Sequence, residues 1–216
     1  MSGLFDAVPQ RSRTVVGWRI MSPMTGDTHK WNLRYADAAE MPPARVLLEN
    51  VYLLPERGVA LDLACGLGAN ALLLASRGLE VCAWDSSAVA IDKLRALAQA
   101  RGLTLQAEVR DVVVRPPEPE RFDVIIVSHF LDRSLAPHLV AALRADGLLF
   151  YQTFTRSRIH ECGPRNLGYL LMDGELLTMF SPLQLMVYRE EGLGGDVDQG
   201  FRGQALLVAR KTTIRR

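Results

Sequence analysis

The sequence predicts an α/β fold with a doubly wound, mostly parallel sheet of seven strands and a C-terminal antiparallel hairpin. Between residues 59 and 154, short apolar runs of strand length alternate with segments of helical period. Residues 122–128 are almost continuously apolar, as a central parallel strand requires. After residue 154, two strand-like runs are joined by a Gly-rich turn without a full helix. Together these observations predict a Rossmann-like sheet with helices on both faces.

Turn residues delimit the predicted helices in order along the chain. The first follows Pro42 and ends at Pro55, and the next three are followed by Gly78, Gly102 and Gly147. The expected helices cover residues 44–54, 70–76, 87–100, 135–143 and 174–180. The expected strands cover residues 59–64, 80–84, 103–109, 122–128, 148–154, 183–189 and 204–209.

Length and composition indicate an ordinary globular protein. The chain has 216 residues, of which 49% are hydrophobic and 23% charged. We expect residues 1–30 to form a flexible N-terminal arm and residues 31–216 to form a single domain. The net charge of +1 gives no broad attraction for a polyanion, so a nucleic-acid partner is not expected.

The cysteines and the N-terminus favour a cytoplasmic protein. Cys65, Cys82 and Cys162 have neither paired spacing nor an even number, which is typical of reduced thiols. The first ten residues lack the pattern of a secretory signal, and no apolar run is long enough to span a membrane. We expect no membrane partner and either a monomer or a homodimer.

The most informative motif is the segment 61–70, with the sequence LDLACGLGAN. It predicts a strand, a turn and a helix start, where Gly66 and Gly68 let a ligand approach the backbone closely. Asp85 closes the next strand, where a carboxylate can accept hydrogen bonds from both hydroxyls of a ribose. The sequence therefore predicts a nucleoside-binding site.

Two kinds of nucleoside fit these positions. Gly66, Gly68 and Ala71 match the G-x-G-x-x-A pattern, so an NAD-dependent oxidoreductase is one alternative. Asp62, four residues before the first glycine, favours the other, because a carboxylate beside a pyrophosphate is costly and a buried one needs a partner. S-adenosylmethionine is cationic and has no phosphate, so it suits Asp62 better. A non-catalytic module that binds the donor or a partner is the third hypothesis.

The segment Asp62-x-x-Cys65-Gly66-x-Gly68 resembles the donor motif of class I S-adenosylmethionine-dependent methyltransferases. The wider pattern, from residue 30 to residue 211, resembles the bacterial tellurite-resistance and thiopurine methyltransferase-like subgroup. The other matching features are residues 31–35, Asp85, Asp111 and residues 174–177. The resemblance implies methyl transfer to a small-molecule acceptor by in-line displacement, with S-adenosyl-L-homocysteine as the product.

The resemblance also implies a role for each matching residue. The backbone of residues 64–68 faces the amino-acid part of the donor, Asp85 holds the ribose and Ser86 lies near the adenine. Asp111 and Val112 contact the adenine, and Ser128 and His129 lie near the methionine portion and the methyl group. The complete expected cofactor-binding set is Trp31, Arg34, Tyr35, Asp62, Ala64, Cys65, Gly66, Gly68, Asn70, Asp85, Ser86, Asp111, Val112, Ser128 and His129.

His129 is the candidate catalytic residue, because an imidazole can remove a proton from an oxygen or nitrogen acceptor. A soft, ionised sulfur or metalloid acceptor would need no base, so this role depends on the acceptor. No metal site is expected, because His29, His138 and His160 have no companion ligands at metal spacing. The basic stretch from Arg156 to Arg165 follows the fifth strand and is the expected acceptor-facing loop.

Overall fold

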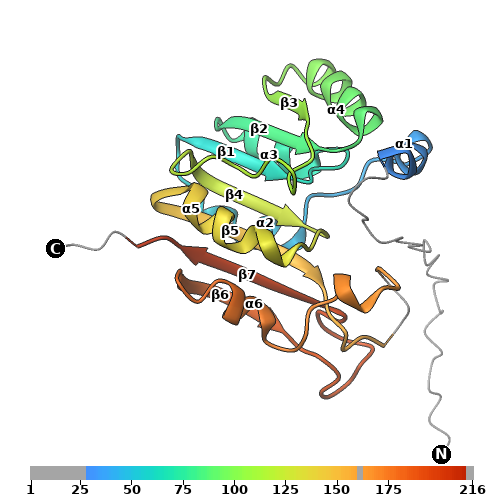
Figure 1. Ribbon diagram of the computed structural model, residues 1–216, viewed down its shortest axis with the longest axis vertical. Helices are drawn as coiled ribbons and strands as arrows, with labels where there is room; N and C mark the ends of the chain where they lie inside the picture. The colour runs from blue at the N-terminus through green and yellow to red at the C-terminus, as the bar shows by residue number, and fades with distance from the viewer. Residues whose placement is uncertain (1–27, 160–162, 213–216) are drawn as a thin grey trace, which may run out of the picture.

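Seven strands form one sheet in the order β3-β2-β1-β4-β5-β7-β6 (Figure 1). The computed structural model describes residues 28–159 and 163–212. The strands are β1 (Val59–Leu63), β2 (Glu80–Asp85), β3 (Gln106–Val109), β4 (Phe122–Ser128), β5 (Leu143–Phe154), β6 (Gln184–Glu190) and β7 (Gln204–Arg210). The helices are α1 (Thr28–Ala36), α2 (Arg45–Leu48), α3 (Ala69–Ser76), α4 (Ala88–Ala100), α5 (Ala136–Ala142) and α6 (Glu175–Met179). Short 3-10 turns occur at Val51–Leu53, Arg133–Leu135 and Leu167–Tyr169.

The pairing of the strands confirms the predicted fold class. The strands β1 to β5 pair in parallel, and β7 runs antiparallel to both β5 and β6. The C-terminal hairpin therefore inserts its second strand into the sheet and leaves β6 at the edge. The strand order reverses between β1 and β4, and open α/β sheets bind ligands at the carboxyl ends of the strands flanking such a point.

Helices cover both faces of the sheet, and each layer has its own apolar core. On one face, α2, α3 and α4 contribute Leu47, Leu72 and Leu94; on the other, α5 and α6 contribute Leu139 and Leu176. Residues 124–127 of β4 lie between the layers and are 0% exposed. This burial on both faces explains why the strand is continuously apolar in sequence.

The structure departs from the predicted elements in a few places. Residues 31–35, which the sequence left unassigned, lie in α1, and the segment predicted as one helix over 44–54 divides into α2 and a 3-10 turn. The fifth strand begins at Leu143 rather than residue 148, because Leu143 pairs with Phe122 across a register shift. Residues 1–27, most of the predicted arm, lie outside the described residues.

Candidate functional site

A cavity of about 510 Å³ lies at the carboxyl ends of β1, β2 and β4, where the strand order reverses. This volume is in the range of small-molecule sites. The predicted site residues that line it are Trp31, Arg34, Tyr35, Ala64, Cys65, Gly66, Gly68, Asn70, Asp85, Ser86, Asp111, Val112, Ser128 and His129. Of the expected set, Asp62 does not line the cavity. The fold thus brings residues that follow β1, β2, β3 and β4, together with helix α1, to a single pocket.

The turn between β1 and α3 has a backbone that favours glycine. Gly66 and Gly68 have φ angles of +54° and +77°, in the left-handed region. A Cβ on Gly66 would lie 2.8 Å from the Tyr35 hydroxyl, and one on Gly68 would lie 2.3 Å from a methyl group of Leu94. Both glycines therefore let other groups approach the turn more closely than a side chain would permit.

Gly68→Ala is expected to lower the free energy of unfolding by about 3 kcal/mol. The new methyl group would overlap Leu94, which is fully buried, so the Leu94 side chain would have to shift within the packed core. The left-handed backbone adds a cost of about 1 kcal/mol for any residue other than glycine. Urea unfolding measures the effect, with Gly78→Ala as the control, since Gly78 is also left-handed but a Cβ there would meet nothing within 4 Å. Equal losses in the two variants would mean that the overlap with Leu94 contributes nothing.

Asp85 shapes the turn as well as facing the cavity. Its Oδ2 accepts a hydrogen bond from the Gly66 amide at 2.8 Å, and its Oδ1 accepts one from the Ser87 amide at 2.9 Å. Burial raises the pKa of this carboxyl above its usual value, although both amide donors act in the opposite direction. Each carboxylate oxygen keeps a further lone pair, so Asp85 can still accept hydrogen bonds from a ligand in the cavity.

Asp62 lies behind the turn and is fully buried. Its Oδ2 accepts a hydrogen bond from the Ala71 amide at 3.0 Å, in the first turn of α3, and its Oδ1 has no hydrogen-bond partner within the described residues. Desolvation raises its pKa to about 7. The carboxyl therefore lies at the positive end of the α3 helix dipole, behind the residues that line the cavity.

The end of the cavity next to β3 is built by the loop that starts at Arg110. The guanidinium of Arg110 lies 3.8 Å from the ring centroid of Trp84 and donates to the carbonyls of Arg115 and Pro116. Asp111 accepts from the amides of Val113 and Val114 through one carboxylate oxygen. The sequence did not identify Arg110 as a site residue, because its stacking partner, Trp84, lies in β2 and is distant in the sequence.

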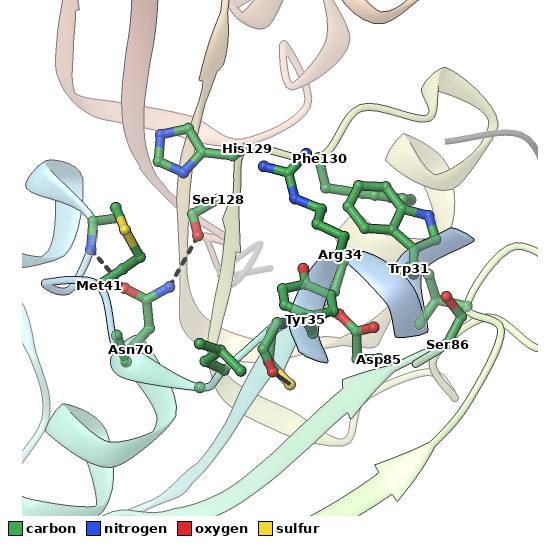
Figure 2. Close-up of a pocket in the computed structure, with 18 of the residues that line it drawn as sticks. Trp31, Arg34, Tyr35, Met41, Asn70, Asp85, Ser86, Ser128, His129 and Phe130 are labelled. Atoms are coloured by element: carbon green, nitrogen blue, oxygen red, sulfur yellow. Dashed lines mark hydrogen bonds between the residues drawn. The ribbon is translucent and has the colours of Figure 1, made fainter. Parts of the chain in front are cut away.

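Helix α1 covers the glycine turn between β1 and α3. Figure 2 shows Trp31, Arg34 and Tyr35 on one side of the pocket and Asn70 and Ser128 on the other. The Trp31 and Tyr35 rings stack with centroids 5.8 Å apart, and the Arg34 guanidinium lies 5.4 Å from the centroid of the Trp31 ring. Burial raises the pKa of the Tyr35 phenol, which therefore stays protonated.

Contacts with α4 fix α1 in this position. The Asn32 Oδ1 accepts a hydrogen bond from the Ser87 hydroxyl at 2.7 Å, next to the start of α4. The Lys93 ammonium donates to the carbonyls of Tyr35 and Ala36 at 2.7 and 2.6 Å, and so satisfies the C-terminal end of α1. Neither Asn32 nor Lys93 was predicted, because each contact joins residues more than fifty positions apart.

At the β4 end, Asn70 joins three parts of the pocket wall. Its Oδ1 accepts from the Ala44 amide at 2.8 Å, and its Nδ2 donates to the Ser128 hydroxyl at 3.0 Å (Figure 2). The hydroxyl of Tyr151 donates to the Phe130 carbonyl at 3.0 Å, which holds the segment after Ser128. These contacts give the pocket wall a defined shape.

His129 has an unusual backbone conformation. Its φ is +55°, in the left-handed region, which costs a residue with a side chain about 1 to 2 kcal/mol. The ring lies 5.1 Å from the Phe154 ring, and the surrounding protein lowers its pKa by desolvation. The imidazole is therefore neutral at neutral pH. Strained residues of this kind are concentrated at functional sites.

At position 129, glycine is expected to give a more stable protein than alanine, by about 1 kcal/mol. Both variants lose the imidazole, but only alanine keeps the steric cost of the left-handed backbone. The same pair of substitutions at His138, an exposed residue within α5, is the control, and there alanine should be the more stable. Urea unfolding of the four variants measures both differences. If alanine were also preferred at 129, the backbone there would not be strained.

The far wall of the cavity is formed by Phe130, Pro164 and Tyr169. Arg133 fixes this wall, because its guanidinium donates to the carbonyls of Gly168 and Leu170 and pairs with Glu175. Part of the expected acceptor-facing loop, including His160, lies outside the described residues.

The described part of the chain offers neither a metal site nor a membrane span. Within residues 28–159 and 163–212, no group of His, Cys, Asp or Glu side chains is arranged to hold a metal ion. No helix in these two ranges is long and apolar enough to cross a membrane.

Comparison with known proteins gives matches to methyltransferases. Residues 60–147 match a family described as "Methyltransferase domain". A curated relative, the ubiquinone biosynthesis O-methyltransferase of Actinobacillus pleuropneumoniae, is 31% identical over 107 residues. This match covers 45% of the present chain and 46% of the relative, so the chain spans about half the length of that protein.

Solved structures share the fold. TehB from Haemophilus influenzae aligns with a TM-score of 0.63 at 20% identity, covering 77% of this chain and 61% of TehB. A structure described as "Conversion of a Disulfide Bond into a Thioacetal Group during Echinomycin Biosynthesis" aligns with a TM-score of 0.64 at 25% identity, covering 86% and 92% of the two chains. The expected class I methyltransferase fold is thereby confirmed.

Proposed function

We propose that this chain, which carries a methyltransferase domain of the class I fold, moves a methyl group from S-adenosylmethionine to a small-molecule acceptor. The observation that carries the proposal is the placement of two carboxylates at the glycine turn. Asp85 accepts a hydrogen bond from the Gly66 amide, and Asp62 accepts one from the Ala71 amide in the first turn of α3. In pyrophosphate-binding sites, such amides and the positive helix end face the phosphates. A turn whose amides already meet carboxylates suits a cationic ligand instead.

Each part of the donor has a candidate partner in the cavity. Asp85 is assigned to the ribose hydroxyls, Ser86 to the rim of the adenine site, and Asp111 with Val112 to the adenine. The backbone of residues 64–68 is assigned to the methionine portion. Because Gly66 and Gly68 carry no side chain, this part of the donor can lie directly on the turn.

The remaining expected residues are assigned to positions around the donor and beside the methyl group that it transfers. Trp31, Arg34 and Tyr35 cover the donor, with Asn70 and Ser128 on the opposite wall. His129 faces the methyl group and acts as the base. The donor supplies an activated methyl group on a sulfonium. What this chain contributes is alignment of the acceptor and exclusion of water, in which α1 closes the pocket above the turn.

A small-molecule acceptor agrees with the cavity volume and with the aromatic wall at Phe130 and Tyr169. The relative from Actinobacillus is named as an O-methyltransferase of ubiquinone biosynthesis, which supports an acceptor of this size. A cytoplasmic location and a monomeric or homodimeric state stay predictions.

Ligand binding to the purified chain tests the proposal. S-adenosylhomocysteine should raise the melting temperature and give a measurable heat in calorimetry, whereas NADH should do neither. The two ligands share an adenosine unit but differ in charge and in the pyrophosphate. Stabilisation by NADH alone would replace the proposal with the oxidoreductase alternative.

A further inference from the structure

A chain of hydrogen bonds behind the pocket fixes which nitrogen of His129 carries the proton. It begins at the Val46 amide in α2, which donates to the Gln152 Oε1 at 2.7 Å. The Gln152 Nε2 donates to the Gln204 Oε1 at 2.7 Å, and the His129 Nε2 lies 3.2 Å from that same oxygen. The four residues come from α2, β5, β7 and the end of β4.

The direction of this chain follows from its first member. A backbone N–H can only donate, so the Gln152 side chain must present its oxygen to Val46 and its NH2 group to Gln204. Gln204 must then present its oxygen, which can only accept. The His129 Nε2, facing that oxygen, must carry a hydrogen. In a neutral imidazole the other nitrogen, Nδ1, is then the acceptor.

The backbone reinforces this arrangement. Gln152 is 3% exposed and pairs with Ser128 in the sheet, and its carbonyl accepts from the His129 amide at 2.8 Å. The same residue therefore holds both the backbone and, through Gln204, the ring of His129. Gln204 does not line the cavity. One ring nitrogen of His129 faces the side of the pocket where Ser128 and Asn70 lie, and the other is directed away from them (Figure 2). The nitrogen that faces the pocket is therefore Nδ1.

We propose that Gln204, oriented by Gln152, is a positioning residue that holds His129 with Nδ1 as a base toward a hydroxyl-bearing acceptor. This inference rests on the proposed function. An O–CH3 bond forms on the acceptor as the S–CH3 bond of the donor breaks and its electron pair stays on sulfur. The acceptor's hydroxyl proton moves to the His129 Nδ1, which leaves an imidazolium held by Gln204. A thiolate acceptor has no such proton and gains nothing from the base, so the arrangement suits an acceptor that must lose a proton, here an alcohol or a phenol.

Nitrogen-15 NMR of the donor-free protein, labelled at histidine, tests the positioning role. The His129 signal is assigned by its loss in His129→Asn. In the wild type we expect the tautomer with the proton on Nε2. Gln204→Leu should shift the population toward the Nδ1–H form, whereas Gln204→Glu should keep Nε2–H and raise the His129 pKa. Gln184→Leu, at the sheet edge where Gln184 bonds Arg210, is the control and should change nothing. A wild-type Nδ1–H tautomer, or an unchanged signal in Gln204→Leu, would overturn the positioning role.

Methyl transfer to catechol tests the acceptor class. In Gln204→Leu, kcat should fall about 10- to 100-fold while S-adenosylhomocysteine affinity stays within about 2-fold of wild type. In Gln204→Glu, the acidic limb of the pH profile should move to higher pH.

A tautomer change without loss of kcat would overturn the role of His129 as base. If the wild type binds S-adenosylhomocysteine but does not methylate catechol, the hydroxyl acceptor is wrong. If it does not bind S-adenosylhomocysteine, the proposed function fails, and the NMR result for Gln204 still stands.

Discussion

Asp85→Ala is expected to weaken the binding of S-adenosylhomocysteine by about 100-fold, which corresponds to about 2.7 kcal/mol. Two effects combine. The variant loses the carboxylate proposed to accept from both ribose hydroxyls, and hydrogen bonds to a charged group contribute about 1.5 to 3 kcal/mol. It also frees the amides of Gly66 and Ser87, which Asp85 holds at 2.8 and 2.9 Å, so the turn loses its shape. Isothermal titration calorimetry gives the dissociation constant directly.

A nearby carboxylate provides the matched control. Asp92 lies in α4, its side chain is 73% exposed, and it forms an ion pair with Arg95 in the same helix. Asp92→Ala removes one negative charge but no cavity contact, so its donor affinity should equal that of the wild type. The ribose assignment would be wrong if Asp85→Ala, shown to be folded by circular dichroism, bound the ligand as tightly as Asp92→Ala.

The fold was predictable because each central element carries a local signal. The β4 strand is continuously apolar because it is buried on both faces, and α3 and α4 are followed by Gly78 and Gly102. Helix α1 lacked such a signal. Its sequence is largely polar, and its position depends on the contacts that Asn32 and Lys93 make between α1 and α4. A helix held by tertiary hydrogen bonds leaves little trace in the periodicity of its own sequence.

In the site as well, residues with a local sequence signal could be predicted, and residues placed by tertiary contacts could not. The residues at strand ends, such as Asp85 and Ser128, could be placed because parallel strands end at one edge of the sheet. Gln152 and Gln204 were not placed, although Gln152 is an isolated amide within the apolar run of β5. A buried amide needs partners, so it marks a tertiary contact. The sequence cannot say that the partners are a helix amide and a residue 52 positions away.

Asp62 is expected to make the stability of the ligand-free protein fall as the pH rises from about 4 to about 7. In the unfolded chain its pKa is near 3.8, and in the folded protein desolvation raises it to about 7. Between these values the folded state holds a proton that the unfolded state has released, so the free energy of unfolding decreases with pH in this window. At 1.36 kcal/mol per pKa unit, the contribution is on the order of 4 kcal/mol, and it levels off about one pH unit above the folded-state pKa.

Asp62→Asn isolates this contribution. The amide cannot ionise, and its oxygen can still accept from the Ala71 amide, so the variant should lack the decline between pH 4 and 7. The other titratable groups are present in both the wild type and the Asp62→Asn variant. The raised pKa of Asp85 acts in the same direction as Asp62, whereas the lowered pKa of His129 makes stability rise with pH below about 6.5. The difference between the two urea-unfolding curves across pH 4 to 8 therefore reports the ionisation of Asp62, including its coupling to Asp85. A constant difference over that range would mean that Asp62 is ionised throughout, with a cation or water satisfying its Oδ1.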